Sequence, residues 1–248
     1  MGLTSYELGA ADGPTVVCLH GVTGHGRRFA ALAARLPGHR VVGVDLRGHG
    51  ASTSLPPWSV EQHVADLVET ADALGLRSAS WLGHSFGGRL VCELAGAHPD
   101  RVERAVLLDP ALHVEPELAL ERAELSRPDA SFASPDEAID ARLADGSLLT
   151  TPRSVLVEEA AAHLAVGDDG RWRWRYSVPA VIAAWSIMAS HAPPWPRSPT
   201  LVVTGERSWL PVRVPRLGTI RHVIVPGGHS VLWDDFDATA DAVASFLG

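Results

Sequence analysis

Short apolar runs alternate along the chain with longer stretches in which apolar and polar residues recur at helical spacing. The runs are rich in Val and Leu and hold few polar positions, which is typical of strands covered on both faces of a sheet. They predict strands over 15–20, 40–45, 78–84, 102–109, 200–206 and 221–227. The stretches beside them predict helices over 26–36, 59–74, 86–97 and 235–247. This alternation predicts an α/β fold with a mostly parallel central sheet and helices on both faces.

Residues 111–195 interrupt the alternation. Their Ala-rich and acidic stretches favour helices, with no strand expected between them, over 115–126, 134–144, 152–165 and 177–190. The interval ends at the Pro-rich residues 192–196, which form a stiff joint before the strand pattern resumes. We therefore predict a core domain formed by 1–110 and 196–248, and a helical cap domain, 111–195, placed to cover the site.

Polar residues and glycines gather where the predicted strands end. In parallel sheets, ligands bind beyond the carboxyl ends of the strands. The residues at these ends are therefore candidates for a functional site: His20, Gly21, Asp45, Ser85, Asp109, Glu206, Gly228 and His229.

Ser85 lies in the sequence GHSFGG, residues 83–88, between a predicted strand and a predicted helix. This context is that of a nucleophile elbow, a very tight turn that lifts a serine hydroxyl clear of the sheet. Such a turn leaves no room for side chains at Gly83 and Gly87. At the start of the following helix, the backbone N–H of Phe86 can face a developing oxyanion. We interpret Ser85 as a nucleophile rather than as part of an ordinary Gly/Ser turn.

A serine hydroxyl is a weak nucleophile without a base. His229 is the candidate base, because it follows Pro-Gly-Gly at the end of the last predicted strand and so lies at the same sheet edge as Ser85. After the first strand, Gly21 allows the N–H of Val22 to point at the reacting carbonyl as a second oxyanion donor. His20 is interpreted as bracing this loop by hydrogen bonding, although an ordinary strand-end histidine would fit equally well.

Together these motifs resemble the α/β-hydrolase fold superfamily over nearly the whole chain. The matching pieces are HG at 20–21, DLRGHG at 45–50, GHSFGG at 83–88, LLDP at 107–110 and GGH at 227–229. The resemblance implies that Ser85 is the nucleophile, that His229 is the base and that 111–195 is the cap domain. It implies a capped, serine-nucleophile enzyme of the esterase or lactonase kind and says little about the substrate.

The triad acid is where the chain departs from the family pattern. Family members usually carry an Asp a few residues after the strand predicted at 200–206, in a Gly-x-x-Asp pattern, and here that position is Ser208. A serine can hydrogen-bond, but it cannot stabilise an imidazolium by charge. We favour Asp109, because certain haloalkane dehalogenases of the superfamily place their acid at the end of the corresponding strand. Glu206 is the alternative acid, and a helix cap is the alternative role for Asp109.

Aromatic residues in a cap indicate an apolar substrate pocket, although packing between cap helices would explain each of them as well. The residues predicted to bind substrate are His84, Trp172, Trp185 and Trp209. Asp45 and Arg47 are expected to form a structural loop, in which backbone donors hold the Asp and the Arg pairs locally.

The composition is that of a globular protein and disfavours some classes of binding partner. Of the 248 residues, 46% are hydrophobic and 20% are charged, which is typical of a globular protein with a large core. The net charge of -8 disfavours binding to nucleic acid or an anionic membrane. With the hydrolase interpretation, the expected partner is a small-molecule substrate. All 21 basic residues are Arg, so no Schiff-base or phosphate-loop lysine is available.

No cofactor or metal is expected, because the sequence has neither a metal-ligand spacing nor a Gly-rich phosphate loop. Cys18 and Cys92 lie in apolar runs and are expected to be core residues rather than a disulfide. The first residues lack the apolar core and basic flank of an export signal, so a cytoplasmic location is expected.

These features predict a cofactor-free serine hydrolase that cleaves a carboxylic ester, thioester or lactone with an apolar part through an acyl-enzyme. One alternative is a hydrolase of carbon–carbon bonds in diketones, because that branch of the superfamily also uses serine. The other is a catalytically weak ligand-binding protein on the same scaffold, which the unusual acid position would favour.

Overall fold

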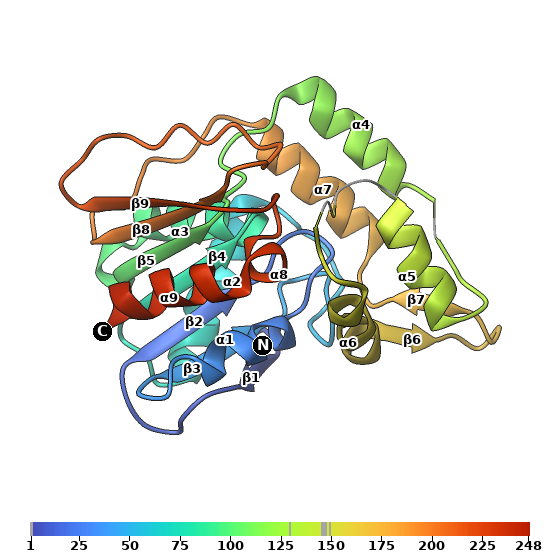
Figure 1. Cartoon of the computed structure of the whole chain (residues 1–248), viewed down its shortest axis with the longest axis horizontal. Helices are drawn as coiled ribbons and strands as arrows, with labels where there is room; N and C mark the ends of the chain where they lie inside the picture. Colours follow the sequence, from blue (N-terminus) through green and yellow to red (C-terminus); the bar gives the residue numbers. More distant parts are fainter. Residues whose placement is uncertain (1, 129, 145–147, 149) are drawn as a thin grey trace.

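A seven-stranded sheet forms the centre of the computed structural model, which describes residues 2–128, 130–144, 148 and 150–248 (Figure 1). From one edge to the other, the strands are β1 (Ser5–Glu7), β3 (Arg40–Val44), β2 (Thr15–Leu19), β4 (Ala79–His84), β5 (Val102–Leu108), β8 (Thr200–Gly205) and β9 (Ile220–Val225). β1 pairs antiparallel with β3, and the other neighbouring strands are parallel. The predicted α/β fold is thereby confirmed, with β1 as an additional edge strand too short to be seen in the pattern.

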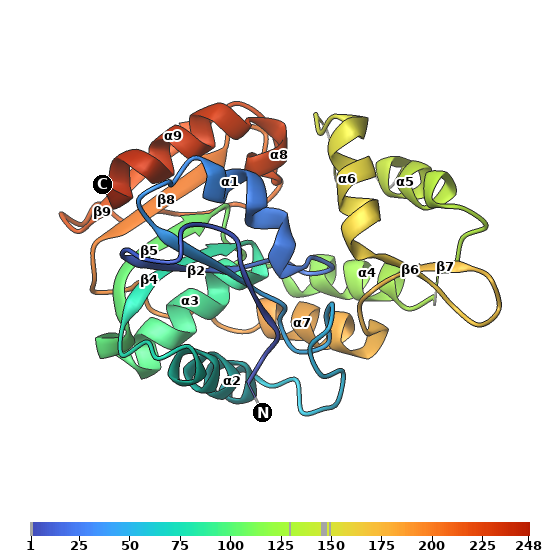
Figure 2. The same ribbon diagram turned by 90° about the horizontal axis from the view of Figure 1, so that it is seen from below.

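Helices cover both faces of this sheet (Figure 2). One face carries η1 (Gly26–Phe29), α1 (Ala30–Ala34), α8 (Val231–Asp234) and α9 (Phe236–Leu247), and the other carries α2 (Val60–Ala73) and α3 (Phe86–Ala97). A short helix, η2 (Pro99–Arg101), leads into β5. Among the described residues, no helix combines the length and the apolarity needed to cross a membrane.

Alternate residues of each central strand point to opposite faces, which explains why the strands read as continuous apolar runs. Val17 and Leu107 pack with α2 and α3, whereas their neighbours Val16 and Val106 pack on the side of α9. All four side chains are almost completely buried. The two apolar clusters on either side of the sheet hold the strand ends in fixed positions.

The 111–195 segment lies to one side of the sheet (Figures 1 and 2). It contains α4 (Pro116–Ser126), α5 (Pro135–Ala144), α6 (Arg153–His163), β6 (Leu164–Val166), β7 (Trp172–Trp174) and α7 (Val178–Ala189). The expectation of no strand in this segment was wrong, because β6 and β7 form an antiparallel hairpin. β6 has only three residues and shows no pattern, whereas β7 lies in an alternation of Arg with Trp and Tyr over 171–176, and the turn between the two strands holds Gly170 with φ +72°.

The segment packs in two parts. Ala184 and Met188 of α7 belong to the same buried cluster as α3, so α7 continues the core of the sheet region. α5, α6 and the hairpin have a smaller cluster of their own, which includes Ile139, Leu156 and Trp174. This second part stands away from the sheet, and a cavity lies between this part and the sheet region.

Candidate active site

Ser85 occupies a sharp turn between β4 and α3. Its φ of 53° and ψ of -117° lie outside the conformations that a serine ordinarily adopts. The neighbouring glycines are required by space: a Cβ on Gly83 would lie 2.3 Å from the carbonyl oxygen of Gly87, and a Cβ on Gly87 would lie 2.3 Å from that of Leu19. The predicted strand–turn–helix geometry is thus present around Ser85.

Two backbone N–H groups lie next to this turn without an acceptor. The loop after β2 approaches Ser85 so closely that a Cβ on Gly21 would be 2.9 Å from the Ser85 Cβ. Among the described residues, neither Val22 nor Phe86 donates its backbone N–H in a hydrogen bond. Unpaired donors in a shielded position are suited to binding a developing oxyanion.

His229 follows the glycine pair after β9 and contacts Asp109 at the end of β5. The His229 Nδ1 lies 2.6 Å from Asp109 Oδ2, and the Asp109 side chain is completely buried. Asp109 also has a positive φ, 41°, which is uncommon for a residue other than glycine. Within the described chain, the His229 ring is hydrogen-bonded to Asp109 and makes no hydrogen bond to Ser85. The hydrogen bond between a catalytic histidine and its serine is often long in enzymes without a bound substrate.

Ser208, which stands where an Asp is usual, contacts the same carboxylate. Its hydroxyl donates to Asp109 Oδ2 at 2.5 Å, and the Gly205 N–H donates to Oδ1 at 3.1 Å. Together with His229, these groups satisfy both oxygens of a buried charge. This Ser208–Asp109 contact could not be predicted from the sequence, because 99 positions separate the two residues.

Glu206, the alternative acid, lies on the surface. Its side chain is exposed, and only its backbone N–H is used, in a bond to the carbonyl of Val225. β8 ends at Gly205, and Glu206 begins the turn that follows, where its side chain has no hydrogen bond to His229 among the described residues.

Two further histidines hold the backbone of the site. Nε2 of His84 lies 3.0 Å from the carbonyl oxygen of His229, and burial together with the nearby His229 ring keeps the pKa of His84 well below its usual value. His20 accepts the N–H of Leu46 at Nε2, while its Nδ1 faces the carbonyl of Gly21 at 2.7 Å. Burial and the neighbouring His49 lower the pKa of His20 as well. Both rings are therefore neutral hydrogen-bonding groups, as was expected for His20.

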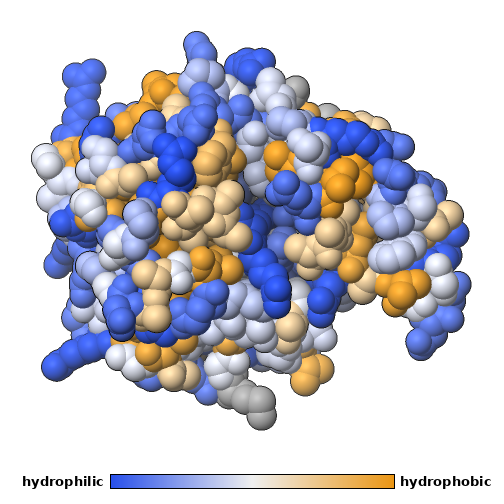
Figure 3. All heavy atoms as spheres, turned by 60° about the horizontal axis from the view of Figure 1, so that its bottom comes forward, coloured by the Kyte–Doolittle hydropathy of each residue, from blue (hydrophilic) through white to orange (hydrophobic). Residues whose placement is uncertain are grey.

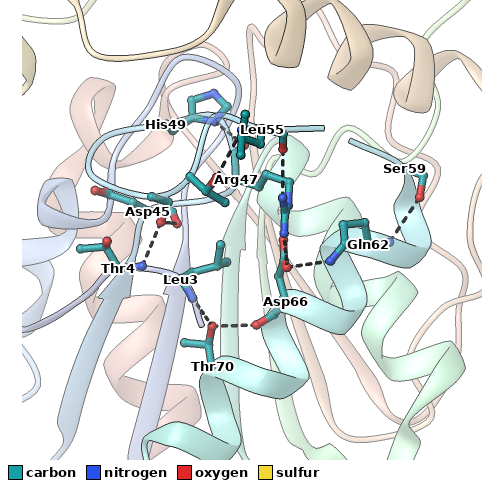
Figure 4. Close-up of polar contacts among 12 residues, drawn as sticks. Leu3, Thr4, Asp45, Arg47, His49, Leu55, Ser59, Gln62, Asp66 and Thr70 are labelled. Carbon is teal, nitrogen blue, oxygen red and sulfur yellow. Dashed lines mark hydrogen bonds and ion pairs between the residues drawn. The ribbon is translucent and has the colours of Figure 1, made fainter. Parts of the chain in front are cut away.

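Asp45 and Arg47 brace the loops beside the site (Figure 4). The Asp45 carboxylate accepts the backbone N–H groups of Gly26 at 2.7 Å and Ala51 at 2.8 Å. Arg47 donates from Nε and Nη2 to both oxygens of Asp66 on α2, at 2.6 and 2.7 Å. These contacts match the structural role predicted for the two residues, and neither lines the cavity described next.

A cavity of about 470 Å³ opens between the sheet and the 111–195 segment, and Figure 3 shows a recess near the middle of the molecule. Ser85 and His229 line it together with three of the predicted substrate-binding residues, His84, Trp185 and Trp209. Trp172 is not among the lining residues, whereas Trp174 is. The hairpin explains the difference: Trp172 is at its outer end, paired through its backbone with Phe132, and Trp174 is at its inner end.

The family model of the alpha/beta hydrolase fold matches residues 14–135. Lipase LipV of Mycobacterium tuberculosis is 37% identical to the chain over 194 residues, which make up 77% of this chain and 74% of that lipase. The chain belongs to the α/β-hydrolase fold family. It is an enzyme of the hydrolase class, as the sequence motifs predicted.

Similarity extends through the 111–195 segment of this α/β-hydrolase. A mouse sn-1-specific diacylglycerol lipase is 32% identical over 265 residues, covering 98% of this chain and 84% of the lipase. The crystal structure of E-2-(acetamidomethylene)succinate hydrolase superposes with a TM-score of 0.85 at 26% identity, over 99% of this chain and 94% of that one. Both similarities therefore include the sheet and the segment beside it.

Proposed function

We propose that this α/β-hydrolase is a serine hydrolase that cleaves a carboxylic ester, thioester or lactone with an apolar part through an acyl-enzyme. The observation that carries the proposal is the meeting of Ser85, His229 and Val22 at one cavity, with Phe86 directly after Ser85; among the described residues, the N–H groups of Val22 and Phe86 have no acceptor. The lipase names of the similar proteins favour an ester over a carbon–carbon bond as the scissile bond.

In the proposed reaction, Ser85 Oγ attacks the carbonyl carbon while its proton passes to Nε2 of His229. The carbonyl oxygen becomes an oxyanion that accepts the N–H groups of Val22 and Phe86. His229 then gives the proton to the leaving alcohol or thiol, and an ester to Ser85 remains. Water, deprotonated by His229, attacks this acyl-enzyme and releases the acid and the free serine.

Asp109 is proposed as the triad acid. Its 2.6 Å contact with His229 Nδ1 supports this role, because a carboxylate there fixes the ring so that Nε2 faces the serine and stabilises the imidazolium. The exposed side chain of Glu206 has no such contact among the described residues. The alternative, a ligand-binding protein on this scaffold, was favoured only by the lack of an Asp at position 208. The contact between Asp109 and His229 argues against this alternative.

The 111–195 segment is proposed as the cap domain. Trp174 and Trp185 come from this segment and line the cavity opposite Ser85. They supply large apolar surfaces of the kind that bind the hydrocarbon part of a substrate.

Steady-state hydrolysis of 4-nitrophenyl butyrate, with a thioester and a lactone for comparison, tests the proposal. Asp109→Asn is expected to lower kcat by about 10⁴-fold, as an amide would hold the wrong tautomer of the histidine. Glu206→Gln, its matched control, is expected to stay within about twofold of the wild type, like most surface substitutions. Undiminished hydrolysis by Ser85→Ala would overturn the mechanism, and loss of activity in Glu206→Gln alone would overturn the acid assignment.

A further inference from the structure

The charged side chains that line the cavity are all cationic. Among the lining residues that the structure describes, the charged ones are Arg28, Arg122 and Arg142, and none is Asp or Glu. The chain as a whole has a net charge of -8. The cavity is therefore suited to an anion, in contrast to the surface as a whole.

Two of these arginines share a buried acid behind the cavity wall. Glu159 on α6 pairs with Arg28, and one of its oxygens lies 3.8 Å from Nη1 of Arg142. Burial alone would raise the pKa of Glu159, but the charge of Arg28 and the hydrogen bond from His25 hold it well below its usual value. The ionised Glu159 thus offsets part of the charge of Arg28 and Arg142.

Arg122 on α4 has no acidic partner in the part of the chain that the structure describes. Residues three and four positions away on a helix are its neighbours, and here they are Leu118, Ala119, Leu125 and Ser126. Among the described residues, the Arg122 guanidinium makes no hydrogen bond or ion pair, and its Nε is buried without a partner. A buried donor without an acceptor is unfavourable, so this group is set up to bind something that the protein does not supply.

The place of Arg122 ties it to the reacting groups. Its Cζ lies over the ring of Trp209, 5.6 Å from the ring centroid. The Trp209 ring in turn lies 5.1 Å from the ring of His229, centroid to centroid. One indole ring therefore separates Arg122 from the proposed base, and all three residues line the same cavity.

We propose that Arg122 binds a carboxylate carried by the substrate, so that the enzyme prefers esters with a carboxylate a few bonds from the scissile carbonyl. The planar guanidinium matches a carboxylate with two parallel hydrogen bonds. Arg122 alone can balance the single charge of a carboxylate. This inference rests on the proposed ester hydrolysis and adds the chemical class of the substrate.

The test compares two pairs of esters that differ only in a carboxylate. In one pair the charge is in the acyl part, 4-nitrophenyl hemiglutarate against its methyl ester; in the other it is in the leaving group, 4-carboxyphenyl acetate against its methyl ester. Arg122→Gln is expected to lower the ratio of kcat/KM, charged over neutral, by about 10- to 100-fold in at least one pair, because charge-assisted hydrogen bonds are lost. Arg122→Lys is expected to retain part of this preference, since it keeps the positive charge but cannot form the two parallel hydrogen bonds of a guanidinium.

Arg127→Gln is the matched control, because Arg127 is an exposed residue of the same helix end, paired with Glu124. It is expected to leave both ratios unchanged. If the wild type hydrolyses the neutral esters but Arg122→Gln changes neither ratio, the carboxylate proposal is wrong while ester hydrolysis stands. If the wild type hydrolyses none of the four esters, the proposed function itself fails.

Discussion

At the scale of single residues, the site depends on how one buried carboxylate is shared. Asp109 accepts hydrogen bonds from the Gly205 N–H, the Ser208 hydroxyl and the His229 ring. Ser208 is thus proposed as a positioning residue for Asp109, the proposed acid, which lies at the end of β5 rather than after β8. Its hydroxyl also accepts the N–H of Leu210 at 3.1 Å, which fixes its orientation.

Ser208→Ala is predicted to lower kcat by about tenfold, because the loss of a hydrogen bond to a charged group weakens the hold on Asp109 by about 1.5 kcal/mol. Ser208→Thr keeps the hydroxyl and is predicted to restore most of the rate. The measurement is kcat across a pH series, with circular dichroism to establish that both variants are folded. Equal rates in the Ala variant and the wild type would contradict this role.

At the scale of elements, a buried ionic cluster joins α6 to the core. Glu159, with its side chain 3% exposed, contacts His25 at 2.9 Å and pairs with Arg28. His25 caps the short helix η1, and Arg28 lies within it. The 111–195 segment is therefore held to the core by charge as well as by the apolar contacts of α7. Removing one partner of a buried pair is strongly destabilising, because the other charge stays buried.

Glu159→Gln is predicted to lower the free energy of unfolding by about 3 kcal/mol at pH 7. The pKa of Glu159 is lowered in the folded state, so its contribution is present above the pKa of the unfolded chain, about 4.3, and is lost as the pH falls further. The difference between variant and wild type should therefore shrink on acidification below that pH. Urea unfolding at several pH values measures this difference in the free energy of unfolding.

Glu158→Gln is the control for this experiment, because Glu158 is the exposed neighbour of Glu159. It should match the wild type at every pH. A Glu159→Gln deficit that stays constant from pH 7 to pH 3 would contradict the proposed ionisation.

At the scale of the whole molecule, the sheet and its two covering layers were predictable from the sequence. Buried parallel strands leave continuous apolar runs, and each of the six predicted strands is present within two residues of its expected bounds. The strands β1 and β6 were not predictable, because three residues show no period, whereas β7 lies in a visible alternation of Arg with Trp and Tyr over 171–176. Short local pairings of this kind depend on tertiary contacts rather than on their own pattern.

The site was predictable where one motif fixes the geometry and not where distant residues meet. The glycines around Ser85 predict a tight turn from six consecutive residues, 83–88. The choice between Asp109 and Glu206 depends on which carboxylate reaches His229 in space, and the sequence contains both. No motif around Arg122 pointed to a role in binding. The proposed role rests on its position at the cavity and on the lack of a polar partner for its Nε among the described residues.

Labelling with a fluorophosphonate, followed by intact mass and peptide mapping, tests most directly the central claim that Ser85 is an activated nucleophile. The account predicts one adduct on the wild type, located on Ser85, absent from Ser85→Ala and formed far more slowly by His229→Ala. No adduct on the folded wild type, or an adduct that persists in Ser85→Ala, would contradict it.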